Sequence, residues 1–244
     1  MSAVLEITNV TRRFAGLIAV NDVSFTLNQG EILGVIGPNG AGKTTLVSLI
    51  SGTLAPTAGS IAFEGRSIVK LPAYRRARLG IGRTFQIMRP FPGLSVLDNV
   101  AVGALFGHGG GESDLARARE LARAQLDFVG LAKFADQRAD ELGGPSRKRL
   151  ELAKALAMQP KVLLCDEVMA GLNLVEIDEV IDVLKRVRER GISILVIEHV
   201  IKAIKSLSDR LLVLHHGEKI ADGDPDAVLS DAQVVEAYLG RRRA

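Results

Sequence analysis

The feature that most constrains the fold is a glycine-rich stretch between an apolar run at residues 31–36 and a helical pattern at 46–50. Its residues are Gly37, Pro38, Asn39, Gly40, Ala41, Gly42, Lys43, Thr44 and Thr45. Glycines in such a stretch let backbone N–H groups converge on phosphate oxygens, where a Cβ atom would block the approach. The positive end of the following helix would point at the same anion. The stretch therefore predicts a phosphate-binding loop, and a plain turn between a strand and a helix is the alternative.

Two side chains of this loop extend the prediction to a nucleotide. Lys43 supplies a positive charge for the β- and γ-phosphates, and the Thr44 hydroxyl can ligate Mg²⁺. The loop by itself does not distinguish phosphate transfer to a substrate from nucleotide hydrolysis, so the rest of the chain has to decide.

Composition narrows the class of protein. The chain has 244 residues, a hydrophobic content of 47% and a formal net charge of +3, which suit a large α/β domain and do not favour DNA binding. Aromatic residues make up 4% and Trp is absent, so platforms for stacking single-stranded nucleic acid are scarce. Cys165 is the single cysteine, which excludes an internal disulfide and suits a reducing cytoplasm. We expect no nucleic-acid partner.

The sequence carries no pattern for secretion or for crossing a membrane. The N-terminus has no basic segment followed by an apolar run, and no apolar stretch approaches the roughly 20 residues needed to span a bilayer. We therefore expect any attachment to a membrane to depend on a partner protein.

The order of apolar patterns predicts an α/β fold. Alternation at 5–10 and 23–27 predicts antiparallel strands with one solvated face. Continuous apolar runs at 162–165 and 192–197 predict central strands of a mainly parallel sheet, joined by a helix in a right-handed crossover. Residues 79–86 are expected to form a further strand that returns to this sheet.

A helical segment is expected to be inserted into this core. Residues 95–98 match the start of a capped helix. A second helical pattern follows, with one apolar face made by Leu115, Ala118, Ala122 and Leu126.

We expect one domain over residues 1–244. Residues 1–87 and 158–244 would form the nucleotide-binding core with its β-layer, and residues 88–157 would form a helical subdomain.

Two adjacent acids follow the apolar run at 162–165. Asp166 lies at the end of the predicted strand, which is where phosphate-loop enzymes hold Mg²⁺. Glu167 comes next, and a carboxylate beside a metal-bound γ-phosphate can orient or deprotonate an attacking water. The alternative is a pair of solvent-facing acids at a strand end, but the phosphate loop favours the catalytic interpretation.

The order of the motifs resembles that of the ABC-type ATPases, and the resemblance covers nearly the whole chain. The order is the phosphate loop, a Gln after a strand (Gln86), a signature loop before a helix, the strand ending in Asp166 and Glu167, the loop 170–173, and a His after the next strand (His199). The resemblance implies an ABC-type nucleotide-binding domain. This is an α/β P-loop NTPase core with a mainly parallel sheet, an N-terminal antiparallel β-layer and an inserted helical subdomain. It also implies ATP and Mg²⁺ as ligands and hydrolysis of ATP as the reaction.

The same resemblance implies roles for single residues. Gln86 would help to hold Mg²⁺ and water and would sense the γ-phosphate, and His199 would contact that phosphate and position Glu167. Phe14 stands where the family places an aromatic ring against adenine. Taken alone, a Gln at a strand end is usually a surface residue, a single His is often structural, and Phe14 can belong to the core. We interpret the neighbouring pair at 215–216 as turn residues rather than metal ligands.

Finer detail is similar to the ATP-binding subunits of branched-chain amino acid importers. It lies in residues 83–86, 166–173 and 236–240. The function expected is therefore energy coupling in an importer of branched-chain or other hydrophobic amino acids. Subunits of lipopolysaccharide-export or urea-type systems are alternatives, and a non-transport ABC ATPase acting on nucleic acid is a more distant one. A small-molecule kinase is disfavoured by the ordered set of motifs.

The signature loop departs from the family's Leu-Ser-Gly-Gly-Gln, because this chain reads Leu142-Gly143-Gly144-Pro145-Ser146. The Ser hydroxyl is missing at Gly143, and Pro145 has no N–H to offer an anion, although proline suits the first turn of a helix. In the family this loop completes the ATP site of the opposite protomer, so Gly143, Gly144 and Ser146 remain candidate nucleotide contacts. Asn173 also replaces the acid of the following loop. We expect the chain to work best in a heterodimer whose other nucleotide-binding subunit has an intact signature.

The resemblance also implies membrane partners. Transmembrane permease subunits would bind near residues 86–100, where Phe91, Leu94 and Val96 could form an exposed apolar cluster or pack within the helical subdomain. A solute-binding protein would be an indirect partner, and the chain would lie peripherally on the cytoplasmic face of the plasma membrane.

Overall fold

The computed structural model describes residues 2–85, 90–108 and 111–239. Gln86, one of the residues expected at the nucleotide, lies outside these ranges.

The first layer is an antiparallel sheet near the N-terminus. Its strands in spatial order are β2 (Leu17–Asn28), β1 (Ala3–Phe14), β4 (Ala58–Phe63) and β5 (Arg66–Ser67). The long pairing of β1 with β2 contains irregularities in register that bend the ribbon. The predicted antiparallel β-layer is confirmed.

The second layer is a six-stranded sheet that carries the chemistry-bearing loops. Its strands in spatial order are β10 (Glu218–Gly223), β9 (Arg210–His215), β3 (Ile32–Ile36), β8 (Ser193–Ile197), β7 (Val162–Asp166) and β6 (Ile81–Arg83). All neighbouring pairs are parallel except the β9–β10 hairpin. Since the carboxyl ends of parallel strands meet at one edge, the loops after β3, β7 and β8 converge there.

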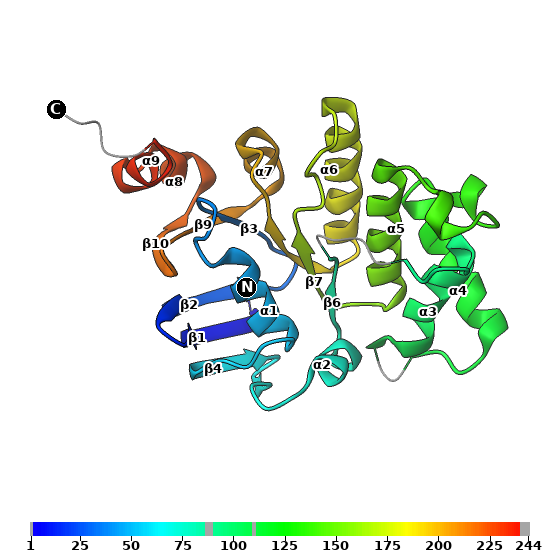
Figure 1. The fold of residues 1–244 in the computed structure, drawn as a ribbon, viewed down its shortest axis with the longest axis horizontal. Helices are drawn as coiled ribbons and strands as arrows, with labels where there is room; N and C mark the ends of the chain where they lie inside the picture. The colour runs from blue at the N-terminus through cyan, green and yellow to red at the C-terminus, as the bar shows by residue number, and fades with distance from the viewer. Residues whose placement is uncertain (1, 86–89, 109–110, 240–244) are drawn as a thin grey trace.

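Helices pack around this sheet and form one end of the molecule beyond it (Figure 1). They are α1 (Lys43–Ser51), α2 (Ala73–Leu79), α3 (Val96–Phe106), α4 (Leu115–Phe128), α5 (Gly144–Ala157), α6 (Leu174–Glu189), α7 (Ile201–Leu207), α8 (Pro225–Ser230) and α9 (Ala232–Leu239), with short 3₁₀ turns at Ala132–Phe134 and Ala139–Glu141. Figure 1 shows α3, α4 and α5 gathered at one end of the molecule, away from β1, β2 and β4.

The buried strands serve two hydrophobic cores because successive side chains point to opposite faces. Leu163 and Cys165 join the core that the helices α3 to α7 share, whereas Val162 and Leu164 join the core under the β-layer and α1. This explains why the strand reads as a continuous apolar run rather than an alternating one.

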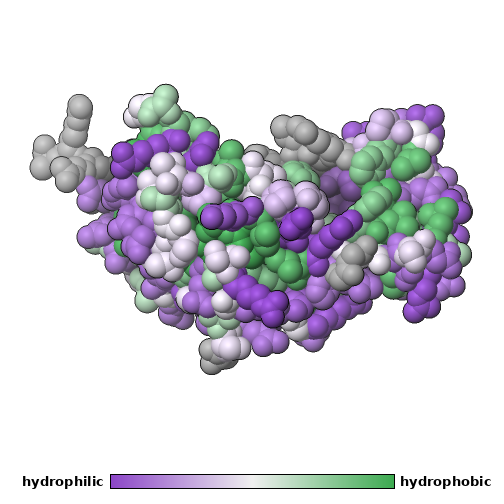
Figure 2. Space-filling view, turned by 90° about the horizontal axis from the view of Figure 1, so that it is seen from below, coloured by the Kyte–Doolittle hydropathy of each residue, from purple (hydrophilic) through white to green (hydrophobic). Residues whose placement is uncertain are grey.

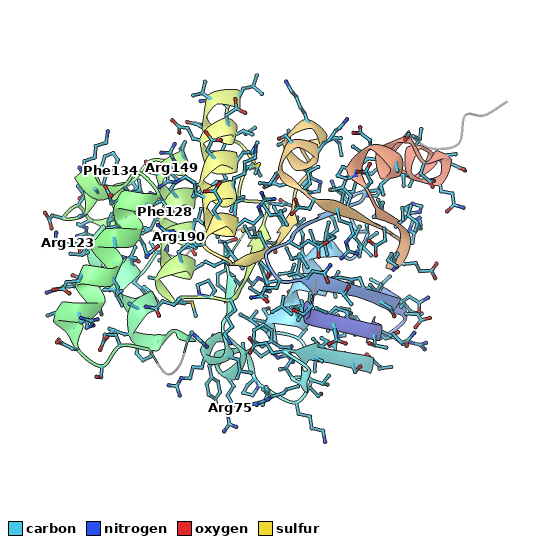
Figure 3. All side chains as sticks on the ribbon, turned by 180° about the vertical axis from the view of Figure 1, so that it is seen from behind. Arg75, Arg123, Phe128, Phe134, Arg149 and Arg190 are labelled. Carbon is cyan, nitrogen blue, oxygen red and sulfur yellow. The ribbon has the colours of Figure 1, made fainter. Side chains whose placement is uncertain are left out.

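Aromatic and basic side chains join α4 to the end of α6. The guanidinium of Arg190 lies 3.5 Å from the ring centroid of Phe128, and that of Arg186 lies 4.3 Å from it. Figure 3 shows Phe128 and Arg190 meeting where the helical end of the molecule faces the core. Cation–π contacts of this kind add to the packing between the two parts.

The start of helix α3 was predicted correctly, but the buried face of α4 was predicted less well. The Ser95 hydroxyl accepts a hydrogen bond from the Asp98 N–H (3.0 Å), which confirms the cap of α3. On α4, Ala118 and Ala122 are buried, but Leu115 is 49% exposed, so placing Leu115 on the buried face was wrong. Leu115 is the first residue of the helix, and the packed positions begin one turn later.

The expected strand at 79–86 is much shorter. Leu79 ends α2, a helix that the pattern did not predict, and Gly80 terminates it with a φ of 111°. Only Ile81–Arg83 pairs with β7. The expected limits of the helical subdomain stay a prediction.

None of the helices within the described ranges combines the length and apolar character that crossing a bilayer requires.

Candidate nucleotide site

The phosphate loop requires glycine for steric reasons that the structure makes explicit. A Cβ atom on Gly37 would lie 2.1 Å from the carbonyl oxygen of Leu214, and one on Gly42 would lie 2.3 Å from that of Ala19. The φ angles at these glycines are 151° and 101°, a region that side chains disfavour. The loop therefore keeps a bare backbone facing the space in front of α1.

Helix α1 begins at Lys43 and offers its free amide groups to the same space. Its N-cap, Gly42, has no side chain to bond the first-turn N–H groups, and the Leu46 N–H is bonded to the Gly42 carbonyl at 2.8 Å. The N–H groups before Leu46 have no partner within the helix, and the helix dipole adds positive potential. The start of α1 therefore has the backbone features that typically bind an anion.

Lys43 points back into the loop. Its Nζ donates to the carbonyl oxygens of Gly37 (2.6 Å) and Pro38 (3.0 Å), and the residue is 6% exposed. Burial lowers the pKa of Lys43, while the charges of Glu167 and Asp166 oppose that shift. The ammonium therefore lies close to both acids that the sequence singled out.

Asp166 ends β7 and is 1% exposed. Its Oδ2 lies 3.1 Å from Nη2 of Arg83, and its Oδ1 is buried with no hydrogen-bond partner among the described residues. Burial raises the pKa of Asp166, and the positive charge of Arg83 opposes the rise. A buried carboxylate oxygen without a partner fits a cation, which is the role expected of this residue.

No group of three or more His, Cys, Asp and Glu side chains in the described part of the chain is arranged to hold a metal. A magnesium ion here would need ligands beyond the protein's acids. That fits the expected pairing of Asp166 with the Thr44 hydroxyl, because Mg²⁺ in such sites is bound largely by phosphates and water.

Glu167 and His199 meet across the strand ends. His199 Nε2 lies 2.6 Å from Glu167 Oε1, and the two side chains come from the loops after β7 and β8. The side chain of Glu167 is 14% exposed and that of His199 is 38% exposed, so the pair is accessible from one side. The two side chains are within hydrogen-bond distance, and the expected role of His199 in positioning Glu167 stays a prediction.

A cavity of about 490 Å³ joins most of these residues. Its lining comprises Phe14, Leu17, Ile18, Ala19, Asn39, Gly40, Ala41, Gly42, Lys43, Thr44, Thr45, Glu167, His199 and His216. Gly37 and Pro38 are not part of this lining and contribute the carbonyl groups that Lys43 contacts. The cavity has a polar half at the loop and an apolar half at the β-layer.

The apolar half is open to solvent. Phe14, Leu17 and Ile18 are 39%, 66% and 37% exposed, and the Arg12 guanidinium lies 4.5 Å from the Phe14 ring centroid. The alternative that Phe14 belongs to the core is therefore wrong, because its ring lies in the cavity wall.

Sequence reasoning gave no role to several residues of this region, among them Leu17, Ile18 and Ala19 in the cavity lining. Arg83 pairs with Asp166 and also donates to the hydroxyls of Ser48 (3.2 Å) and Ser51 (3.0 Å) in α1. His216 lies in the β9–β10 turn, as expected, but also lines the cavity. Only the packing of distant segments reveals both placements.

The signature loop lies elsewhere on the molecule. Gly143, Gly144 and Ser146 do not line the cavity, and Gly143 is the N-cap of α5 without a side-chain cap. Helix α5 starts at Gly144, and Pro145 lies in its first turn, as the sequence predicts for this proline. Asn173 has a structural role, because it forms a reciprocal capping box with Glu176 at the start of α6.

The apolar cluster expected at a docking surface is only partly exposed. Phe91 and Leu94 are 43% and 37% exposed, whereas Val96 is fully buried in the core of the helical part. Val96 therefore belongs to the packing, as the alternative proposed.

The sequence of this chain is similar to known families and proteins. Residues 20–170 match the model of the ABC transporter family, and residues 218–244 match that of the branched-chain amino acid ATP-binding cassette transporters. The chain is 35% identical to the high-affinity branched-chain amino acid transport ATP-binding protein BraF of Pseudomonas aeruginosa, covering 97% of this chain and 98% of BraF. It is also 35% identical to LivG of Escherichia coli K12, over 97% of each.

Solved structures give the same picture. An ATP-binding cassette of an ABC transporter in its ADP conformation superposes with a TM-score of 0.88 at 32% identity, covering 99% of this chain and all of that one (100%). A dimeric bacterial ABC transporter cassette gives a TM-score of 0.83 at 26% identity, covering 91% of this chain and 98% of the other.

Proposed function

The chain belongs to the ABC transporter family as an ATP-binding, ATP-hydrolysing subunit, and on that premise we propose that it powers the import of branched-chain or other hydrophobic amino acids. The observation that favours this solute class is the match of residues 218–244 to the branched-chain cassette model. Relatives named for branched-chain amino acid transport cover nearly the whole chain and support the same class.

We propose that ATP binds with its phosphates on the loop and its base on the apolar half of the cavity. The amide groups at the start of α1 and the ammonium of Lys43 face the β- and γ-phosphates. Phe14 offers a ring face for adenine, with Leu17 beside it.

We propose that Thr44 and Asp166 hold Mg²⁺, together with Gln86. The partnerless Oδ1 of Asp166 and the open position of Thr44 in the cavity support this assignment. When bound, the ion neutralises charge on the phosphates and orients them.

Hydrolysis then rests on Glu167. Its carboxylate accepts a proton from a water molecule whose oxygen attacks the γ-phosphorus, and the bond from that phosphorus to the oxygen bridging to the β-phosphorus breaks. His199, 2.6 Å from Glu167, holds the carboxylate in place and faces the γ-phosphate. Lys43 offsets the charge that shifts toward the β-phosphate as the bond breaks.

In this proposal, two kinds of partner subunit complete the transporter. The first is a second nucleotide-binding subunit, in a heterodimer, whose signature loop closes over this ATP. The signature loop of this chain, with Gly143, Gly144 and Ser146, faces the partner's ATP in return. The altered loop, without a Ser hydroxyl at Gly143 and with no N–H at Pro145, supports a partner of different sequence.

The other partner is a pair of membrane permease subunits on the cytoplasmic face of the plasma membrane, with a solute-binding protein acting indirectly. Phe91 and Leu94 are exposed apolar side chains near the segment expected to dock a permease helix. Figure 2 views the molecule of Figure 1 from below. On the surface seen there, apolar residues gather in the middle and toward the end with α3 and α4.

Transport in a reconstituted system tests the solute class. The chain is co-expressed with the permeases and binding protein encoded beside it, placed in liposomes, and supplied with ATP inside. We expect uptake of labelled leucine, isoleucine or valine, with loss of uptake when Lys43 is changed to Ala. Uptake of urea instead, or outward movement of lipopolysaccharide, would contradict the proposed class while leaving the ATPase intact.

A further inference from the structure

The backbone of Glu167 has an unusual conformation. Its φ is 54°, in the left-handed region that non-glycine residues seldom adopt. Such a conformation costs on the order of 1–3 kcal/mol and persists only when surrounding contacts hold it. The question is which residues hold the backbone that carries the proposed general base.

Several hydrogen bonds hold this turn, and one is local, because the Ala170 N–H donates to the carbonyl of Glu167 at 3.3 Å. The Glu167 N–H donates to the carbonyl of Ile197 at 3.0 Å, which continues the β7–β8 ladder. Lys148 Nζ donates to the carbonyl of Glu167 at 3.1 Å. On the far side of the turn, the Met169 N–H donates to Oε1 of Glu198 at 2.7 Å.

Glu198 is a buried acid at the end of β8, 1% exposed, and it directly precedes His199. Burial raises the pKa of Glu198 to about 7, while the Met169 N–H and the charge of Lys148 oppose the rise. Burying an ionised acid costs free energy unless hydrogen bonds or opposite charges compensate it. The catalytic steps above do not use it.

Lys148 comes from a different part of the fold. It lies in α5, just beyond the signature loop, and its pKa is lowered by burial while the charges of Glu198 and Glu167 oppose that shift. The ammonium therefore lies near both acids. It connects the helix of the signature loop to the loop after β7.

We propose that Lys148 and Glu198 are positioning residues that clamp the two sides of the turn 167–169 and thereby aim the Glu167 carboxylate. The inference rests on the proposed role of Glu167 in hydrolysis. Because Lys148 belongs to α5 and bonds the Glu167 carbonyl, a shift of α5 would also shift the backbone of Glu167. The signature helix thus supports the general base of its own chain, in addition to its expected contact with the partner's ATP.

The test uses the complex purified with its membrane subunits in detergent. Lys148→Met removes the donor and keeps the length of the side chain, and Lys185→Met, at an exposed lysine of α6, is the control. We expect Lys148→Met to lower kcat about 10- to 100-fold with little change in KM for ATP or in Tm, since small misplacement of a catalytic group has effects of this size. The control should keep the wild-type kcat.

Glu198 gives a graded test of the same idea. Glu198→Gln keeps an oxygen that accepts from the Met169 N–H, whereas Glu198→Ala removes it. We expect Glu198→Gln to keep more of the kcat than Glu198→Ala, with nucleotide affinity unchanged in both. Equal kcat values for wild type, Lys148→Met and Glu198→Ala would overturn the inference.

Combination with Glu167→Gln separates positioning from general damage. If Lys148 acts through Glu167, the residual single-turnover rate of Glu167→Gln does not fall further when Lys148→Met is added. A further 10- to 100-fold loss would show that Lys148 acts otherwise. If Glu167→Gln alone turns over like wild type, the proposed function of Glu167 fails first, which distinguishes the two failures.

Discussion

At the scale of single residues, the site depends on groups held in costly environments. Asp166 keeps a buried oxygen without a partner, Glu167 takes a left-handed backbone, and Glu198 is an acid within the core. Each of these features lowers the stability of the fold, and each helps to set the positions of groups near the cavity. Glu198 offers the clearest measurement of this cost, because its charge changes near neutral pH.

The stability of the protein should therefore depend on Glu198 between acidic and neutral pH. Its pKa is about 7 in the folded chain against an ordinary value of 4.5, so the folded state holds a proton that the unfolded state releases in this window. Stability contributed by that proton is lost as pH rises, because the unfolded state binds fewer protons. We expect the free energy of unfolding of wild type, relative to Glu198→Gln, to fall by about 1–3 kcal/mol between pH 5 and 7.5.

Urea unfolding of both proteins at the two pH values measures this difference. The nearby charged groups, Lys148, Glu167 and His199, are present in both proteins and largely cancel. Parallel pH dependence in the two would mean that Glu198 has no raised pKa in the fold.

At the scale of elements, the start of α5 carries the altered signature loop, in which Gly143 and Pro145 replace residues of the Leu-Ser-Gly-Gly-Gln pattern. Gly143 has φ and ψ of −67° and 162°, which suit a serine N-cap, and a Cβ there would meet no atom within 4 Å of it. The backbone can therefore accept the family's residue without strain. The helix therefore keeps its shape, and what is lost is the side-chain hydroxyl at position 143 and the backbone N–H at Pro145.

Restoring the family's donors should increase the activity of the chain without its partner. In the double variant Gly143→Ser, Pro145→Gly, each of two identical subunits regains a hydroxyl and an N–H directed at the opposite ATP. We expect the ATPase rate of the chain alone to rise about 100-fold or more, because one donor to a transition-state anion is worth on the order of 10²-fold in rate. The same double variant carrying Glu167→Gln should stay inactive and excludes a contaminating ATPase. An unchanged rate would contradict the assignment of this loop to the partner's site.

At the scale of the whole molecule, the sequence predicted what depends on neighbouring residues and missed what depends on distant ones. The phosphate loop, the strand ending in Asp166 and the crossover to β8 were readable because strand, loop and helix are contiguous. Arg83, Lys148 and His216 reach the site only through packing of segments far apart along the chain. Helix α2 escaped notice because it is short, and because its last residue, Leu79, and the following Gly80 fall within the strand expected at 79–86.

The cavity itself joins loops from the β-layer, the phosphate loop and the strand ends, so only the assembled layers define it. The same assembly leaves one wall of the cavity open, where a second cassette is expected to close. ATP held between two cassettes would join them, and its hydrolysis would let them separate.

Sedimentation of the chain mixed with the second nucleotide-binding subunit encoded beside it, with and without MgATP, tests this cycle most directly. With Glu167→Gln and MgATP, the two subunits should sediment as a stable 1:1 complex. Wild type should form that complex only until its ATP is consumed, and Lys43→Ala should not form it. A Glu167→Gln mixture that consumes ATP and separates at the wild-type rate, or a complex that forms equally well without nucleotide, would contradict the cycle.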